Sequence, residues 1–407
     1  MISGIFKKRL SELFRNIPIY YAGLFFLLVV FVLDYAPGGE HQFSFLAESF
    51  LKGKLYFLSQ PGSWHDAVFF SGNYYWPLGP FPAVLLMPFV YVFDLMGRFF
   101  YQGYLQFFLV IMVFMGCFKI SRRISYSKSD SIYLAYAFCF SSVFLGVALV
   151  PSGWQFAQVV ATLLLFLSIL EFFGKKRYWL LGIIMGLVAA TRATAGLGII
   201  LFALEIILSK KHLKIKAKDM LRLSIPFGLA IAGLLLYDYF RFGNIFEQGY
   251  AYQLLNGELE KARSYGMFSF SHFLSNIYYS FLSMPSPVFK DSTSVLIYPF
   301  IQANPWGMSI FLTSPYLLTV FFLKNNDKLS KILLIAIFFI AFPIMMYYGI
   351  GWYQFGYRYA LDFMPFLFLL FMLNYHKENK VLSWKIKVVI LLSSFLNLHL
   401  FFTIFHG

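Results

Sequence analysis

The sequence has 407 residues, of which 60% are hydrophobic and 13% are charged, and its formal net charge is +15 at pH 7. Soluble domains carry about twice that fraction of charged residues, so the composition excludes an ordinary soluble enzyme and indicates a polytopic membrane protein. In so apolar a chain, cytoplasmic loops that set membrane orientation explain the excess of Lys and Arg better than nucleic-acid binding does.

About eleven apolar runs are long enough to be membrane spans. They cover residues 17–33, 101–120, 131–150, 155–173, 178–191, 193–208, 222–240, 305–323, 332–350, 357–374 and 387–405. No small-residue cleavage site follows the first run, so we expect an uncleaved span there and not a signal peptide. The run 79–96 is doubtful because Pro80, Pro82 and Pro88 remove backbone donors that lipid could not replace.

The basic clusters between these runs decide how the doubtful run is interpreted. They are Lys7–Arg15, Arg122–Lys128, Lys175–Arg177, Lys210–Lys218, Lys324–Lys331 and Lys377–Lys387. If 79–96 crossed the membrane, every later cluster would be inverted. If it does not cross, all of the clusters fall on the cytoplasmic side, as the positive-inside rule requires. We therefore expect a cytoplasmic N-terminus, an external C-terminus, and a juxtamembrane or re-entrant helix over 79–96.

This topology leaves two large external loops, over residues 34–98 and 242–305. In the first loop, HQFSFLAESFLKG places its apolar residues on one helical face. In the second, FSFSHFLSNIYYSFLSMP alternates apolar and polar residues at helical spacing, which predicts an interfacial amphipathic helix. The predicted fold is a single all-α transmembrane bundle over 1–407, with juxtamembrane helices in both loops.

Three arginines lie at predicted external span ends, where arginine should be scarce. They are Arg192 in AATRATAG, Arg241 in YDYFRFGN and Arg358 in FGYRYALD. Each has a local explanation: Arg192 can snorkel to lipid phosphates, Arg241 can pair with Asp238, and Arg358 can pair with Asp362. Together they favour a shared anion site, because arginine binds phosphate oxygens bidentately. At this depth the predicted ligand is a lipid phosphate or diphosphate.

Several carboxylates of the first loop are candidate general bases. Asp34 ends the first span, Glu40 and His41 follow a PGG turn, and Asp66 precedes the aromatic segment GNYYW. A carboxylate at a membrane-facing entrance can accept the proton of a hydroxyl nucleophile. The competing interpretations are a helix-terminating residue for Asp34, an N-cap for Glu40, an ordinary loop residue for His41 and a turn residue for Asp66.

The first loop also carries four aromatic residues close together, Trp64, Tyr74, Tyr75 and Trp76. Together with His41 they are candidates for sugar or acceptor binding, because aromatic rings form stacking walls for sugars. Anchoring at the membrane interface explains the aromatic residues equally well.

Several segments occur in a recognisable order: FLAESFLKGKLYF, HDAVFFSGNYYWPLGPFPAVLLMPF, VAATRATAGL, YDYFRFGNIFEQGYAY, NPWGMSIFLTSPYLL and FGYRYALDFMPFLFLL. In this order they resemble the GT-C superfamily of membrane glycosyltransferases, nearest to the branch of bacterial protein O-mannosyltransferases and aminoarabinose transferases. The resemblance implies a helical membrane domain and a catalytic acidic residue in the first external loop. It also implies a polyprenyl-phosphate sugar donor and chemistry on the non-cytoplasmic face.

The sequence departs from this family pattern in one respect, since the first loop has no Asp-Asp or Asp-Glu doublet. The carried-over catalytic role therefore falls on either Asp34 or Glu40. No cofactor is assigned, and a requirement for a divalent metal stays open.

The expected function is transfer of a sugar from a polyprenyl-phosphate donor to a hydroxyl of a glycan, lipid or protein acceptor. The expected location is the bacterial inner membrane, where membrane lipids surround the chain, and no nucleic-acid partner is expected. One alternative is a transporter or flippase for lipids or lipid-linked glycans, which requires ionisable residues buried mid-span; Glu171 and Glu205 are the candidates. Another is a glycan polymerase or ligase that uses lipid-diphosphate donors.

Overall fold

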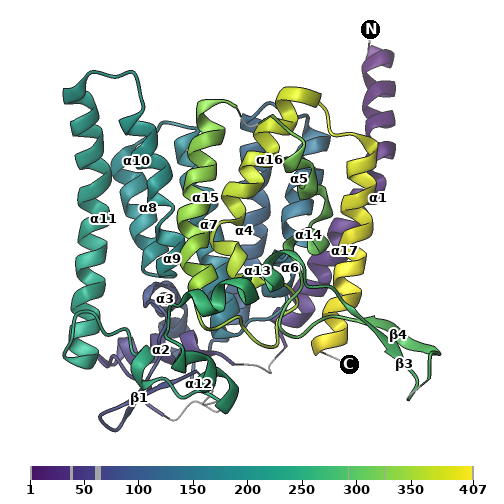
Figure 1. Cartoon of the computed structure of the whole chain (residues 1–407). Helices are drawn as coiled ribbons and strands as arrows, with labels where there is room; N and C mark the ends of the chain where they lie inside the picture. Colours follow the sequence, from purple (N-terminus) through teal and green to yellow (C-terminus); the bar gives the residue numbers. More distant parts are fainter. Residues whose placement is uncertain (1, 37–39, 60–65, 292, 325, 406–407) are drawn as a thin grey trace.

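The computed structural model describes residues 2–36, 40–59, 66–291, 293–324 and 326–405, with side chains from residue 17 onward. Most of the described chain is helical, and Figure 1 shows the longer helices side by side in one bundle. These helices are α1 (Ile2–Asp34), α4 (Gln102–Arg123), α5 (Lys128–Phe140), α7 (Gly153–Phe172), α8 (Tyr178–Ala189), α10 (Ile199–Ile207), α11 (Leu213–Phe242), α15 (Lys328–Met346), α16 (Met364–Asn379) and α17 (Trp384–Phe405).

Within the described residues, six helices are long and apolar enough to cross a membrane, so the chain is an integral membrane protein. They cover Ile17–Asp34, Gln102–Arg123, Gly153–Phe172, Leu213–Phe242, Lys328–Met346 and Trp384–Phe405. The other predicted spans contain shorter elements: α5 with α6 (Phe144–Ala148), α8, α9 (Ala193–Gly196) with α10, α14 (Ile310–Thr313) with the 3₁₀ helix η3 (Pro315–Phe321), and α16. The count of about eleven spans therefore stays a prediction.

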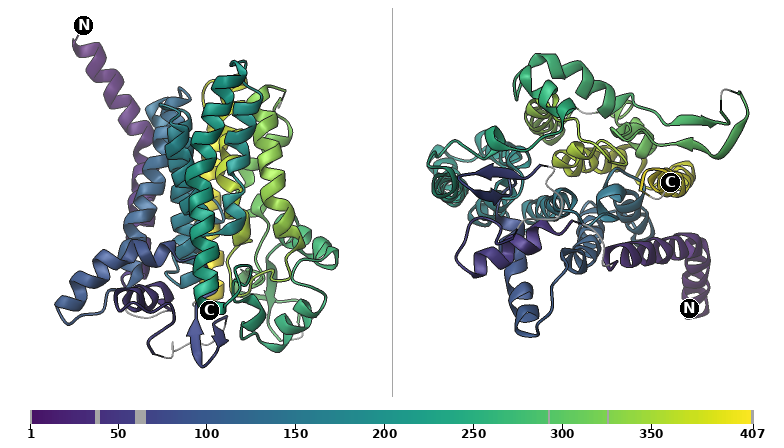
Figure 2. Two further views of the ribbon diagram at one scale, coloured as in Figure 1. Left: turned by 90° about the vertical axis from the view of Figure 1, so that its left-hand side faces the viewer. Right: turned by 90° about the horizontal axis from the view of Figure 1, so that it is seen from below.

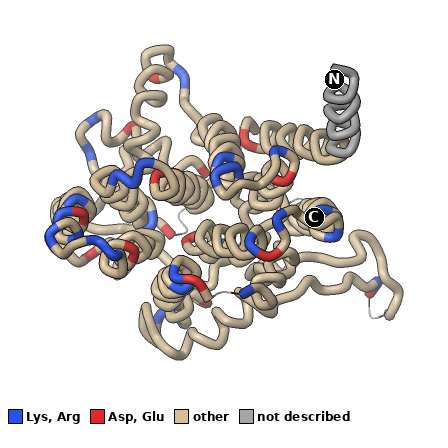
Figure 3. Tube along the Cα trace, turned by 90° about the horizontal axis from the view of Figure 1, so that it is seen from above, with Lys and Arg blue, Asp and Glu red and all other residues tan. Residues whose placement is uncertain are grey.

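The basic connections lie together at one end of the bundle, which we call the basic end. Figure 3, seen from this end, shows Lys and Arg spread over the connections between helices. Contacts tie these connections to one another: Arg123 to the Leu170 carbonyl, Lys176 to Glu205, Lys328 to the Leu208 carbonyl, Lys377 to Asp327, and Lys387 to Asp130. The side chains of Lys7–Arg15 lie outside the described residues. Which side of the membrane the basic end faces stays a prediction.

The opposite end, which we call the loop end, holds the two predicted external loops (Figure 1). The first loop contains α2 (Gln42–Leu51), the hairpin of β1 (Val68–Phe70) and β2 (Asn73–Tyr75), and α3 (Phe81–Leu95). Helix α3 packs on α2, and Figure 2 shows it projecting sideways at the loop end and not running along the bundle. This is the segment predicted to be a juxtamembrane helix, and its Pro80 stands at the N-cap, where a missing backbone donor costs little.

The second loop contains η1 (Tyr250–Tyr252), α12 (Gly257–Ser264), η2 (Phe270–His272), α13 (Phe273–Phe281), and the hairpin of β3 (Ser286–Phe289) and β4 (Leu296–Gln302). A further 3₁₀ helix, η4 (Arg358–Asp362), precedes α16. The predicted amphipathic helix corresponds to η2 and α13. Its polar Asn276 and Ser280 are buried against the bundle, whereas Phe270 and Leu274 are exposed. The two hairpins correct the all-α prediction, since both loops contain short strands.

Candidate functional site

Two adjoining cavities lie at the loop end. The arginine cavity has a volume of about 190 Å³ and is lined by Arg192, Arg241 and Tyr237, among others. The carboxylate cavity has a volume of about 510 Å³ and is lined by Glu40 and Asp66, among others. Trp154, Tyr347 and Tyr359 line both cavities and so form the wall between them.

Arg192 reaches the arginine cavity because the chain breaks between α8 and α10. It is the N-cap of the short helix α9 and has an extended backbone, with φ −146° and ψ 111°. Its Nε lies 2.5 Å from Asp362 Oδ1 and its Nη2 lies 3.0 Å from Asp362 Oδ2. The Thr194 hydroxyl donates to the same carboxylate. The pairing of Asp362 with Arg358 that the local sequence suggested is therefore replaced by a bidentate pair with Arg192.

Arg241 lies in the last turn of α11, and its pairing with Asp238 is confirmed, with Nη2 2.5 Å from Asp238 Oδ1. Its Nη1 donates to the Trp76 carbonyl at 2.9 Å, and its guanidinium lies 4.1 Å from the ring centroid of Tyr237. Among the described residues, no partner accepts from Arg241 Nε, and none bonds the Tyr237 hydroxyl, although both atoms are buried. A buried polar group without a partner costs free energy, so both atoms favour a ligand that accepts hydrogen bonds.

The proline-rich segment of the first loop forms one wall of the arginine cavity, through residues 77–80. It lies directly on the end of α8, where the Phe81 amide donates to the Ala190 carbonyl at 3.1 Å. A Cβ at Gly79 would lie 2.1 Å from that carbonyl oxygen, so only glycine permits this approach. This contact therefore holds the segment in place as one wall of the cavity.

Tyrosines surround the wall between the cavities. The Tyr359 ring centroid lies 5.6 Å from the Arg192 guanidinium carbon and 5.4 Å from that of Arg358. Burial raises the pKa of Tyr250, which lies in the second loop. Its hydroxyl therefore stays protonated at neutral pH and remains able to donate a hydrogen bond.

The carboxylate cavity brings together three of the predicted site residues: Glu40, Asp66 and Arg358. Glu40 Oε2 accepts from Gln42 Nε2 at 2.7 Å. Asp66 is bound to the second loop, because Gln253 Nε2 donates to its backbone carbonyl at 3.2 Å and to its Oδ1 at 3.4 Å. The contact between Asp66 and Gln253 thus joins the two external loops in the wall of this cavity.

Asp34 lies elsewhere. Its side chain is fully buried between α1 and α4, where Gln106 Nε2 donates to its Oδ1 at 2.9 Å. Gln106 also donates to the Val147 carbonyl at 3.2 Å, so it joins the end of α1 to α6. Asp34 lines neither cavity.

The other predicted aromatic and histidine residues that the structure describes line neither cavity. Trp76 is buried, with its ring centroid 5.0 Å from that of Trp154, and its carbonyl positions Arg241. His41 is buried with its ring 4.9 Å from that of Tyr101. Tyr75 packs on Phe242, and Tyr74 packs on Phe69. Trp64 lies outside the described residues.

Sequence reasoning missed all three residues of the shared wall. Tyr347 and Tyr359 belong to the aromatic stretch YYGIGWYQFGYRY, and Trp154 begins the span that follows PSG. Aromatic residues that cluster at predicted external span ends were the available signal. Among the described residues, no group of three His, Cys, Asp or Glu side chains is placed to hold a metal ion.

These features define a helical integral membrane protein with a two-part cavity at one end of the bundle, lined by arginines, carboxylates and aromatic rings. No protein-family model and no curated protein matches the chain. The solved structure of the Archaeoglobus fulgidus oligosaccharyltransferase in its apo form is similar, with a TM-score of 0.46 and 14% identity over 93% of this chain and 55% of that one. The same organism's oligosaccharyltransferase AglB, in complex with an inhibitory peptide and a dolichol-phosphate, has a TM-score of 0.48 and 13% identity over 96% of this chain and 56% of that one. The chain thus spans just over half of these neighbours, and similarity at this level assigns it no function.

Proposed function

We propose that the protein is a membrane glycosyltransferase that moves a sugar from a polyprenyl-phosphate donor to an acceptor hydroxyl. One observation carries the proposal. Arg241 and Tyr237 line the arginine cavity, and Arg241 Nε and the Tyr237 hydroxyl are buried hydrogen-bond donors without a partner among the described residues. A phosphate oxygen would satisfy both donors, and the guanidinium of Arg241 would match its charge.

The remaining lining of the arginine cavity favours a lipid-linked phosphate over a soluble one. Its side walls come from α11 and α15, through the apolar residues Leu234, Pro343 and Ile344. Both helices are candidate membrane spans. A prenyl chain can therefore leave the cavity along apolar helix surfaces while its phosphate stays beside Arg241.

The carboxylate cavity is suited to the acceptor. In the proposed reaction the acceptor oxygen bonds to the anomeric carbon of the sugar, and the bond between that carbon and the phosphate oxygen breaks. The hydroxyl proton passes to the carboxylate of Glu40 or Asp66. The polyprenyl phosphate leaves with its charge stabilised by Arg192 and Arg241. The sugar would lie against the shared wall of Trp154, Tyr347 and Tyr359, where both cavities meet.

The sequence favoured Asp34 or Glu40 as the general base, whereas this proposal assigns that role to Glu40 or Asp66. The reason is position, since Asp34 lines neither cavity, whereas both other acids line the one next to the arginine cavity. We assign Asp34 a positioning role, because its bond with Gln106 holds the end of α1 beside α4.

The two alternatives have different support. A transporter would need acids buried mid-bundle, but Glu171 pairs with Arg177 and Glu205 pairs with Lys176, both at the basic end. A polymerase or ligase with a lipid-diphosphate donor would use the same arginines, so the donor must be distinguished by experiment.

Binding of polyprenyl phosphate, polyprenyl diphosphate and free prenol to the full chain in nanodiscs tests the proposal. We expect the monophosphate to bind and Arg241→Ala to weaken that binding, on the order of tenfold or more. Arg98→Ala is the matched control, because Arg98 is an exposed loop-end arginine that lines neither cavity. Equal binding of prenol, or unchanged binding by Arg241→Ala, would contradict a phosphate site. Preference for the diphosphate would favour the polymerase or ligase.

A further inference from the structure

A second pair of cavities lies at the basic end, on the outer side of α8 and α11. One has a volume of about 560 Å³ and includes Lys175 and Lys176, and the other has a volume of about 550 Å³ and includes Lys218. Trp179 and Arg222 line both, so the two form one continuous groove. The groove is remote from the arginine cavity, because it lies at the other end of the same two helices.

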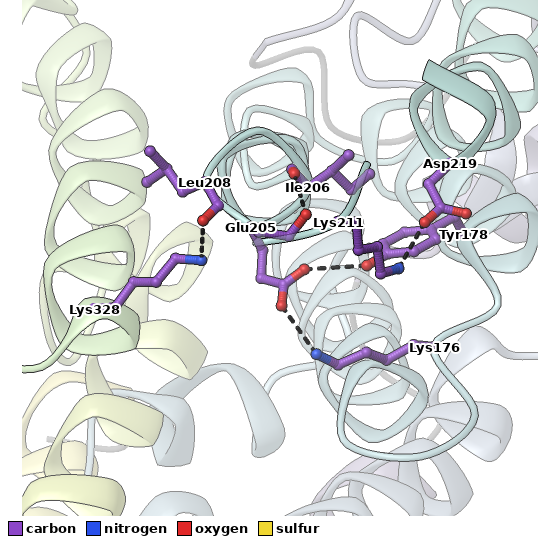
Figure 4. Close-up of polar contacts among 9 residues, drawn as sticks. Lys176, Tyr178, Glu205, Ile206, Leu208, Lys211, Asp219 and Lys328 are labelled. Atoms are coloured by element: carbon purple, nitrogen blue, oxygen red, sulfur yellow. Dashed lines mark hydrogen bonds and ion pairs between the residues drawn. The ribbon is translucent and has the colours of Figure 1, made fainter. Parts of the chain in front are cut away.

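The groove has an excess of positive charge after its local ion pairs are counted. Figure 4 shows the paired groups, in which Lys176 contacts Glu205 at 3.0 Å and Lys211 contacts Asp219 at 2.7 Å. Over the described part of the chain, the groove residues Lys175, Lys214, Lys218 and Arg222 take part in no ion pair. The local acids are therefore already paired, and four cations remain to attract an anion.

An apolar stripe continues from the groove along α11 towards the middle of the bundle. Leu221 and Ile225 line the groove, Leu229 follows one turn further, and all three are exposed. In the most apolar 18-residue stretch of α11, only 6% of the residues are buried inside the protein, whereas the corresponding share in α7 is 83%. Helix α11 therefore presents most of its surface to the surroundings. A cationic groove that continues into an exposed apolar stripe matches a phospholipid, whose headgroup is charged and whose acyl chains are not.

The same two helices connect the groove to the arginine cavity. They pack closely, since a Cβ at Gly182 would lie 2.3 Å from the Leu223 carbonyl oxygen and one at Gly186 would lie 2.6 Å from Ala230 Cβ. At the loop end, α8 leads to Arg192 and α11 carries Arg241.

We propose that this groove binds the phosphate headgroup of an anionic membrane phospholipid, with an acyl chain along Leu221, Ile225 and Leu229. Bound there, the lipid bridges the start of α8 and the first half of α11 and so stabilises the helix pair. Soluble phosphate lacks the chains that would use the stripe, and a zwitterionic lipid lacks the net charge that the unpaired cations favour. This site does not depend on the proposed catalytic activity.

The test compares thermal unfolding of the full chain in neutral detergent with added phosphatidylglycerol, phosphatidylcholine or inorganic phosphate. We expect phosphatidylglycerol alone to raise the unfolding temperature, since a ligand of the folded state stabilises it. In the variant Lys218→Gln/Arg222→Gln, the phosphatidylglycerol concentration that gives half of the maximal rise in unfolding temperature should increase on the order of tenfold or more. Lys380→Gln/Lys385→Gln is the matched control, because it removes equal charge from the end of α16 and the start of α17, outside the groove. This variant should respond as the unmodified chain does.

Equal stabilisation by phosphatidylcholine, an equal shift with inorganic phosphate, or an undiminished response in the groove variant would each overturn the proposal. A second measurement leaves the groove's charges unchanged. A photo-crosslinking residue in place of Leu221 should capture phosphatidylglycerol in preference to phosphatidylcholine from mixed nanodiscs. Capture in proportion to abundance would show only a non-specific lipid surface.

Discussion

Arg192 and Asp362 are 170 residues apart in the sequence and form a bidentate ion pair whose side chains are only 7% and 1% exposed. The pair joins the break between α8 and α10 to η4, the segment that also carries Arg358 and Tyr359. It therefore fixes the positions of two elements that line the cavities.

Replacing Asp362 by Asn should destabilise the protein strongly, because it leaves the Arg192 charge buried without its counter-charge. Breaking a buried pair from one side typically costs about 3–5 kcal/mol of stability. Thermal unfolding in detergent measures the effect. Glu171→Gln is the comparison, since it breaks an ion pair whose arginine is 44% exposed, and it should cost far less. Equal losses of stability in the two variants would mean that the buried ion pair contributes no more to stability than an exposed ion pair does.

The Tyr237 hydroxyl gives a prediction in which stability and binding change in opposite directions. It is buried without a partner among the described residues, so Tyr237→Phe should leave the empty protein as stable or slightly more stable. The same change should weaken polyprenyl-phosphate binding about tenfold, because a hydrogen bond to a charged group contributes about 1.5–3 kcal/mol. Unfolding temperature and lipid affinity measured on one sample separate the two effects. Weaker stability with unchanged affinity would refute the proposed contact.

The sequence predicted those features that depend on local composition. The long apolar runs are helical, as expected, because a helix satisfies the hydrogen bonds of its own backbone. Pro80 and Pro88 correctly indicated the segment that lies across the loop end. The pair of Arg241 with Asp238 was predictable because the two residues are one helical turn apart.

Contacts between distant segments could not be predicted in this way. Asp362 had an obvious partner four residues away in Arg358, but tertiary packing brought Arg192 to it instead. Asp66 is likewise held by Gln253, from the other loop. The all-α prediction left out the strands of both hairpins, because short strands in a chain so rich in apolar residues show no distinct alternation.

The orientation in the membrane is tested by single-cysteine labelling, with both native cysteines, which are buried and free, replaced by Ala. An impermeant maleimide applied to intact cells should label Gly257→Cys in the second loop. It should label Lys128→Cys, at the basic end, only after permeabilisation. Both positions are exposed, so burial does not explain a difference between them. Labelling of position 128 in intact cells would contradict the predicted topology and would place the basic end outside the cell.

The identity of the base is tested by amide substitutions at the three acids. Glu40→Gln, Asp66→Asn and Asp34→Asn each keep the size of the side chain and remove its basicity. We expect Glu40→Gln or Asp66→Asn to lower turnover by a factor of roughly 100 or more, because each acid lines the cavity that would hold the acceptor. Binding of polyprenyl phosphate should survive in that variant, since Arg192 and Arg241 line the other cavity. Asp34→Asn should keep turnover whenever it folds, and its unfolding temperature reports its structural role. Loss of turnover in a stable Asp34→Asn variant, with normal rates in the other two variants, would identify Asp34 at the end of α1 as the general base.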